Sequence, residues 1–126
     1  MAVFLVCAGL LGLLAAALTI QVGRVRTRKR IFLGDGGDPE MVAAIRAHGN
    51  LLEFTPLILL LIWLLHGPYG NRIIAVLAVF LLLARLLHAG GMLGYVKFGR
   101  FAGALTTTLV LAVASIMLVV SGVRAL

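Results

Sequence analysis

Long apolar runs constrain this chain more than any other feature of its sequence. The first, Met1–Ile20, contains no charged residue, and about 20 apolar residues in a helix cross the roughly 30 Å of hydrocarbon in a bilayer. Further apolar stretches follow, and we place the four spans at about residues 1–22, 39–66, 72–94 and 100–124. The pattern predicts an all-α fold, an integral membrane four-helix bundle in one domain over residues 1–126.

The composition excludes most other protein classes. Hydrophobic residues make up 63% of the chain and charged residues 12%, against about 45–50% and about 25% in soluble domains. These values argue against a water-soluble globular domain and against a disordered chain. A signal peptide would have a basic start and a shorter apolar core of about 7–15 residues, so we interpret the first run as a span.

The positive charge predicts how the bundle is oriented. The net charge is +7, and the apolar excess favours a membrane-surface role for it over nucleic-acid binding. Five basic residues lie between the first two spans, and Lys97 and Arg100 lie between the last two. Because cytoplasmic loops collect Lys and Arg, we expect both connections in the cytoplasm of an inner membrane. Anionic-lipid contact is a second use for the Arg24–Arg30 segment.

The second span has recognisable boundaries. Asp38-Pro39 is typical of a helix start, with Asp as the N-cap and Pro in the first turn. Pro56 removes a backbone donor and should bend the helix. The segment Gly67–Asn71 has the composition of a tight turn before the third span.

Polar side chains inside the spans are the candidate site. Arg46, Asn50 and Glu53 have i, i+4, i+7 spacing and share one helix face, and Arg85 and His88 share another. An ionisable side chain costs about 2.5–3.5 kcal/mol at the bilayer centre. One interpretation is an intrahelical ion pair that fixes packing. The other is a pocket for a small zwitterionic or anionic ligand, because Arg binds carboxylates and Glu accepts from an ammonium.

Other site types have weaker support. His48 faces away from Arg46 and Asn50, so we interpret it as a packing residue, and His66 as a surface residue. Two histidines without a thiolate partner make a poor metal site, so we expect no metal. The Gly34–Gly37 stretch lacks the Lys-Ser/Thr of a phosphate loop.

A family resemblance rests on the second span. Residues Arg46–Pro56 follow the pattern R-A-H/Q-x-N-x-x-E with a nearby Pro, and Ala84–His88 adds support in the third span. The sequence resembles the membrane-associated proteins in eicosanoid and glutathione metabolism, the MAPEG family, over about residues 21–100. Its third span is similar to the prostaglandin E synthase-like branch.

The resemblance implies a homotrimer that binds glutathione, as a cosubstrate, between protomers near the cytoplasmic side. By the family pattern, Arg46, Asn50 and Glu53 would hold the glutathione backbone, and Arg26, or alternatively Arg24, would meet a carboxylate. The same pattern assigns three further residues: Arg85 and His88 would line the pocket, and Arg100 would stabilise the thiolate as the catalytic residue. A nearby cation lowers a thiol pKa, and the thiolate is the nucleophile.

The implied function is glutathione-dependent transfer or peroxidase chemistry on lipophilic electrophiles that enter from the bilayer. Three tyrosines frequent in the family are replaced by Phe54, His88 and Met92. These changes keep open an alternative, a non-catalytic protein of the same fold that binds lipids or other lipophilic molecules or acts as a scaffold. A small multidrug-type transporter is disfavoured, because the first span has no carboxylate.

Overall fold

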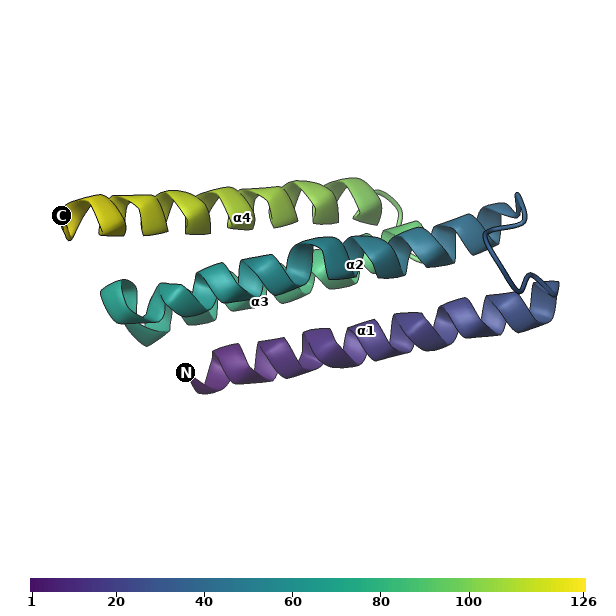
Figure 1. Cartoon of the computed structure of the whole chain (residues 1–126), viewed down its shortest axis with the longest axis horizontal. Coiled ribbons are helices and arrows are strands. Elements are labelled where there is room, and N and C mark those ends of the chain that lie inside the picture. Colours follow the sequence, from purple (N-terminus) through teal and green to yellow (C-terminus); the bar gives the residue numbers. More distant parts are fainter.

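The computed structural model describes residues 1–126 as four long helices packed side by side (Figure 1). The helices are α1 (Ala2–Lys29), α2 (Pro39–Leu64), α3 (His66–Met92) and α4 (Gly99–Arg124). Each helix is long and apolar enough to cross a membrane. The predicted all-α four-span bundle is therefore confirmed.

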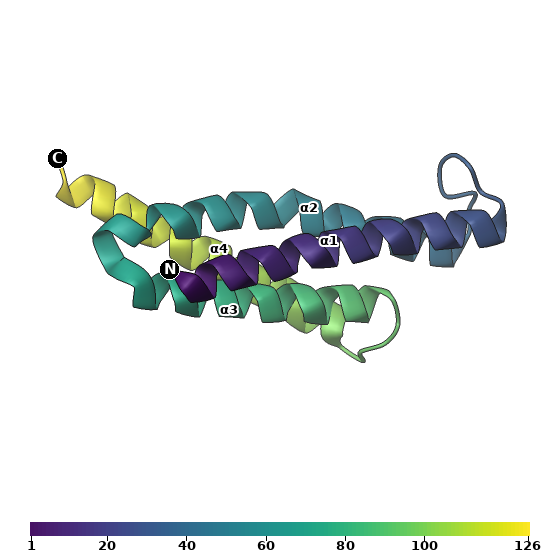
Figure 2. The same cartoon turned by 90° about the horizontal axis from the view of Figure 1, so that it is seen from below.

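Both termini and the α2–α3 connection lie toward one end of the bundle, and the other two connections lie toward the opposite end (Figures 1 and 2). The α1–α2 hairpin extends past the α3–α4 turn. The two basic connections are therefore on the same side of the bundle.

Two helix ends differ from the predicted boundaries. Helix α1 continues to Lys29, because Arg and Lys form helix well and favour the negative end of the helix dipole. Arg30 then ends it in a left-handed conformation with φ 56°. At the other end, the expected turn at residues 67–71 is mostly helical. Helix α3 begins at His66, and the chain departs from helical geometry at Gly70, with φ 71°, which glycine adopts without strain.

The core joins all four helices. Its main cluster of buried apolar side chains includes Leu11, Ile58, Leu81 and Ala114, and a smaller cluster of Val25, Met41 and Ala44 lies between α1 and α2. The most extensive contact between helices is that of α3 with α4. A Cβ atom on Gly103 would lie 2.5 Å from the carbonyl oxygen of Ala84 and the amide nitrogen of His88. Small residues at such positions let membrane helices approach closely.

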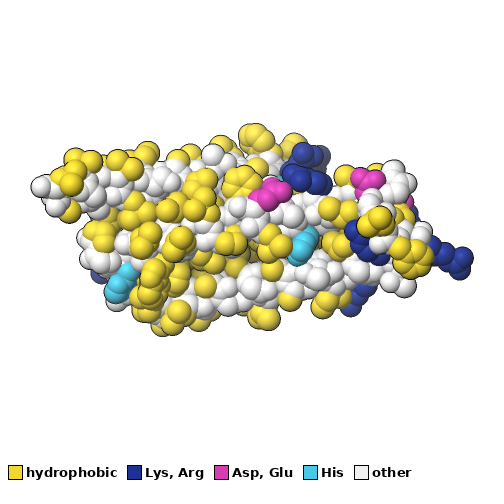
Figure 3. Space-filling model, viewed as in Figure 1, with side chains coloured by type: hydrophobic (Ala, Val, Ile, Leu, Met, Phe, Trp, Pro, Cys, Tyr) yellow, Lys and Arg dark blue, Asp and Glu magenta, His cyan; other side chains and the backbone are white.

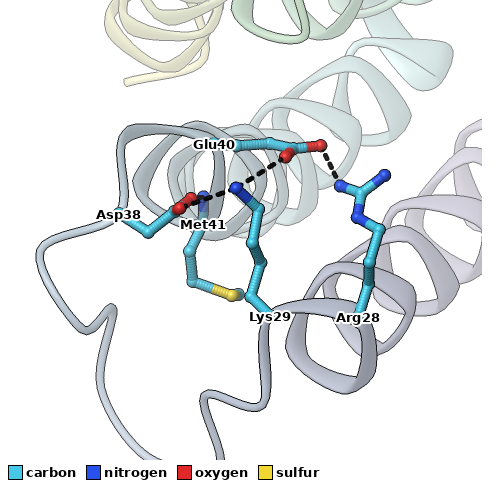
Figure 4. Close-up of polar contacts among 5 residues, drawn as sticks. All are labelled: Arg28, Lys29, Asp38, Glu40 and Met41. Carbon is cyan, nitrogen blue, oxygen red and sulfur yellow. Dashed lines mark hydrogen bonds and ion pairs between the residues drawn. The ribbon is translucent and has the colours of Figure 1, made fainter.

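The start of α2 is fixed by charges (Figure 4). Asp38 Oδ1 accepts a hydrogen bond from the Met41 amide at 2.9 Å, which confirms Asp38 as the N-cap. Lys29 Nζ lies 2.8 Å from Asp38 Oδ2 and 3.6 Å from Glu40 Oε2, and Arg28 pairs with Glu40. The hydrogen bond from Lys29, followed by that from the Met41 amide, lowers the pKa of Asp38 below its ordinary value of 3.8. These contacts join the two helix ends across the connection.

Candidate functional site

The polar face of α2 carries an ion pair. Arg46 Nη1 lies 3.5 Å from Glu53 Oε1, and the two side chains are 56% and 52% exposed. The shared face predicted from the spacing is confirmed, and so is the intrahelical ion pair. Both groups point out of the protomer, so they remain accessible to a ligand or to another copy of the chain.

Arg85 lies inside the bundle behind this pair. It is 1% exposed, and its Nη2 donates to Asn50 Oδ1 at 2.9 Å. Its Nη1 donates to Thr107 Oγ1 at 3.5 Å, while its Nε has no partner. The structure thus links α2, α3 and α4 through one guanidinium.

Thr107 is a member of this group that the sequence reasoning missed. Its hydroxyl accepts from Arg85 and donates to the Gly103 carbonyl oxygen at 2.7 Å. The available signal was its position seven residues after Arg100, on the same face of α4.

A small cavity of about 60 Å³ lies at the junction of these helices. Its lining residues are Asn50, Phe54, Arg85, Ala104, Thr107 and Thr108. This volume holds a few water molecules and is far below the roughly 300–1,000 Å³ of small-molecule sites. A peptide therefore does not fit inside this cavity.

His88 is buried in the contact between α3 and α4, next to Gly103. Its Nδ1 has no hydrogen-bond partner. It lies outside the lining of the small cavity, although Arg85, on the same helix face, is part of that lining. Within one protomer, His88 packs against α4 and is separated from the exposed ion pair.

Arg100 lies in the first turn of α4 and is exposed. It makes no side-chain hydrogen bond or ion pair within the protomer, so its guanidinium is free to bind an anion. On the face shown in Figure 3, the charged side chains gather toward the end that carries the α1–α2 connection, and apolar side chains cover much of the rest. Free positive charge is thus concentrated at this end of the molecule.

Arg26 makes its contacts within the α1–α2 connection. Its Nη1 donates to the carbonyl oxygens of Ile31 at 3.2 Å and Gly34 at 2.9 Å. The side chain therefore stabilises the α1–α2 connection and makes no hydrogen bond to Arg46 or Glu53 within the chain. Arg24 is exposed and has no hydrogen-bond partner.

The other histidines make local contacts. His48 Nε2 lies 3.0 Å from Thr19 Oγ1 between α1 and α2, which confirms it as a packing residue. His66 is half-buried; it stacks on Trp63 and lies 3.1 Å from Asn71 Oδ1. No group of three or more His, Cys, Asp or Glu side chains comes together.

The exposed groups form a donor and acceptor set of definite chemistry. The planar guanidinium of Arg46 can donate two hydrogen bonds to a carboxylate, and Glu53 can accept hydrogen bonds from an ammonium. The oxygen of Asn50 accepts from Arg85, and its amide hydrogens are free to donate. This set fits a zwitterionic peptide. Ionic groups on the outside of a span are costly against lipid, so the face requires a polar ligand, water or another protein surface.

Comparison with known proteins agrees with the sequence motif. The model of the MAPEG family matches residues 4–120. The chain is 34% identical over 80 residues to the inner membrane protein YecN of Escherichia coli K12, and equally to YecN of Escherichia coli O6:H1 strain CFT073. Each match covers 63% of this chain and 61% of the relative, so it spans less than two thirds of the relative's length.

Proposed function

Because the chain belongs to the MAPEG family, we propose that it is a membrane glutathione-dependent transferase or peroxidase acting on lipophilic electrophiles. The observation that carries this proposal is the exposed Arg46–Glu53 pair on a membrane-spanning helix, with Asn50 held beside it by Arg85. Because the pair faces out of the bundle, a ligand can reach both side chains.

The residues present suit glutathione, which has two carboxylates, an ammonium, two amides and a thiol. In the proposed complex, Glu53 accepts from the ammonium, Arg46 binds a carboxylate and Asn50 binds the peptide backbone. Arg26 would meet the second carboxylate after leaving the Ile31 and Gly34 carbonyls. Arg24, which has no such contacts to lose, is the alternative. Arg85 and His88 would support the site from inside the bundle.

The proposal includes a homotrimer. Closed symmetric assemblies are the rule for identical subunits, and the family resemblance sets the number at three. A neighbouring copy would cover the charged face of α2 and remove Arg46 and Glu53 from lipid. Glutathione and a lipophilic molecule entering from the bilayer would then meet between protomers.

Arg100 is the proposed catalytic residue. Its free guanidinium would stabilise the glutathione thiolate, because a nearby cation lowers a thiol pKa. With an aryl halide, the thiolate sulfur bonds to the ring carbon, and the halide leaves with the electron pair of the broken bond. The proton released by the thiol passes to water.

An inner-membrane location is part of the same proposal, since the relatives are named as inner membrane proteins. The two basic connections lie at one end of the bundle (Figure 1). We place this end in the cytoplasm, where loops rich in Lys and Arg are found and where the pocket would meet glutathione.

The decisive experiment is aryl halide conjugation by the purified protein in lipid nanodiscs. We expect Arg100→Ala to lower the conjugation rate by about tenfold or more, since one unit of thiol pKa changes the thiolate fraction tenfold below that pKa. Glutathione affinity should change little. Arg124→Ala, at the other end of α4, is the matched control and should retain full activity. A wild type inactive toward aryl halides and hydroperoxides would contradict the catalytic proposal.

The second candidate is a non-catalytic protein that uses the same pocket for binding or scaffolding. Phe54 favours it, because this residue lines the small cavity without offering a hydroxyl. Glutathione binding without turnover of any electrophile would support this candidate over the enzyme.

A further inference from the structure

Exposed aromatic side chains gather around the α3–α4 connection. Tyr95, Phe98 and Phe101 are 76%, 75% and 71% exposed. Lys97 lies among them in the sequence, with its Nζ 5.4 Å from the centre of the Phe98 ring. We call these four residues the aromatic–basic patch. It combines apolar rings with a positive charge on the outside of the protomer.

Phe98 holds its ring outward in a strained conformation. It precedes α4 in the left-handed region with φ 61°, which is unfavourable for a bulky residue. Its ring is mostly exposed, so contacts within the protomer give it little burial in return. An apolar surrounding outside the protomer would stabilise this arrangement.

The length of α3 places the patch at the surface of a bilayer. Beyond Gly70, α3 runs from Asn71 to Met92 and rises about 33 Å at roughly 1.5 Å per residue, close to the roughly 30 Å of hydrocarbon. The connection that follows is a turn at the end of the bundle (Figure 2). The patch is therefore at the level of the lipid headgroups, where aromatic rings anchor membrane proteins and lysines extend toward the surface.

Lys97 has no carboxylate partner in the chain. The sequence contains four acidic residues and none after Glu53. Three of the four form ion pairs with basic residues of the chain: Asp38 with Lys29, Glu40 with Arg28, and Glu53 with Arg46. A second copy of the chain would therefore offer Lys97 only one unpaired acidic side chain, Asp35. The membrane is the better source of a complementary anion, because anionic headgroups attract basic residues at its surface.

We propose that the aromatic–basic patch binds the headgroup region of an anionic phospholipid. Lys97 binds the phosphate, and the rings of Phe98 and Phe101 contact the glycerol and the first methylenes of the acyl chains. A zwitterionic lipid carries its own ammonium, which weakens the attraction to Lys97. The patch shares no residue with the Arg46–Glu53 face, and it requires no glutathione.

Quenching of tryptophan fluorescence by brominated lipids tests this proposal. Trp63 is the only tryptophan of the chain, so a reporter protein with Trp63→Phe and Phe98→Trp carries its single indole in the patch. Phosphatidylcholine nanodiscs receive a minor fraction of acyl-brominated lipid, either phosphatidylglycerol or phosphatidylcholine. Lys97→Gln removes the charge of the patch. Arg124→Gln is the matched control, because it removes an exposed basic residue at the other end of α4.

We expect both brominated lipids to quench the reporter, with about a fivefold preference for phosphatidylglycerol at the patch, which corresponds to about 1 kcal/mol for one basic residue near the membrane surface. Lys97→Gln should remove most of this preference while quenching by both lipids persists. Arg124→Gln should leave the preference unchanged. Circular dichroism of each variant checks that the helices are retained.

Four results would overturn the proposal. Equal quenching by the two lipids, or a preference unchanged by Lys97→Gln, would show that the patch does not select an anionic headgroup. Quenching by aqueous acrylamide without quenching by either lipid would place the ring in water. Protection from both acrylamide and lipid would identify another copy of the chain as the occupant. Glutathione is absent from these samples, so the outcome is independent of the proposed enzymatic function.

Discussion

At the scale of single residues, Arg85 determines how the polar interior is held together. It binds Asn50 and Thr107 on two neighbouring helices. The planar guanidinium can serve both partners at once, whereas the ammonium of lysine has a different shape and reach. Arg85 therefore positions Asn50, whose free amide hydrogens face the proposed ligand.

Replacing Arg85 with lysine tests this role. We expect Arg85→Lys to destabilise the protein by about 2 kcal/mol, the range for losing a buried hydrogen bond to a charged group. Arg46→Lys, at an exposed position, should cost less than about 1 kcal/mol. Thermal denaturation in detergent micelles measures both, and equal losses would show that Arg85 does not bridge the helices.

Predictions for single residues were accurate where the spacing of two residues in the sequence determines whether their side chains are close on one helix. Arg46 and Glu53 share a face because seven residues make almost two helical turns, and they form the pair. The contacts of Arg26 and Thr107 could not be predicted in this way. They depend on how the α1–α2 connection folds back and on the rotation of α4 against α3, which no local pattern specifies.

At the scale of helices, the α3–α4 contact depends on glycine. A Cβ on Gly103 would approach backbone atoms of α3 to 2.5 Å, and one on Gly91 would lie 2.0 Å from the Arg100 amide nitrogen. Backbone cannot move aside as the end of a side chain can. The start of α4, and with it Arg100, is therefore positioned by close packing.

Gly103→Ala should destabilise the protein by about 1–3 kcal/mol, as expected for overpacking. Gly122→Ala is the matched control on the same helix. It meets nothing within 4 Å and should be neutral or slightly stabilising, because alanine favours helix. The measurement is chemical denaturation followed by circular dichroism. A Gly103→Ala protein as stable as the control would rule out the tight contact.

The α1–α2 connection should respond to acid. The folded state lowers the pKa of Asp38, so the unfolded state binds more protons at low pH. The ionised Asp38 contributes fully to the stability of the folded state above its ordinary pKa of 3.8. This contribution is lost as the pH falls through the lower pKa of the folded state. Hydrogen exchange at the Met41 amide should therefore be protected at pH 6 and accelerate below about pH 4, relative to the intrinsic rate.

The Asp38→Asn variant distinguishes the effect of the Asp38 charge from its effect as the N-cap of α2. Asparagine caps helices about as well as aspartate but does not titrate, so protection at Met41 should lose its acid dependence in this range. An acid dependence that persists in the variant would assign the effect to another group.

Element boundaries were less predictable than the elements themselves. The four spans follow from apolar length, and Asp38-Pro39 marks the start of α2 as expected. The extension of α1 to Lys29 was not expected, because a run of basic residues is as typical of a loop as of a helix end. The chain likewise departs from helical geometry at Gly70 alone, whereas the composition predicted a turn over Gly67–Asn71.

At the scale of the whole molecule, charge and apolar surface are separated. On the face shown in Figure 3, apolar residues cover much of the surface, and most of the charged side chains lie toward one end. The exposed Arg46–Glu53 pair breaks this separation, because it belongs to a membrane-spanning helix. In the proposed homotrimer, another protomer and a bound peptide would cover the pair.

Glutathione titration of the purified protein in nanodiscs is the direct test of binding at the Arg46–Glu53 face. We expect saturable binding, weakened about tenfold or more by Glu53→Gln, since a hydrogen bond to a charged group is worth about 1.5–3 kcal/mol. Arg124→Ala, outside the site, should bind as wild type does. Absence of glutathione binding to the wild-type protein, or unchanged affinity in Glu53→Gln, would contradict the claim and leave the Arg46–Glu53 pair with a structural role alone.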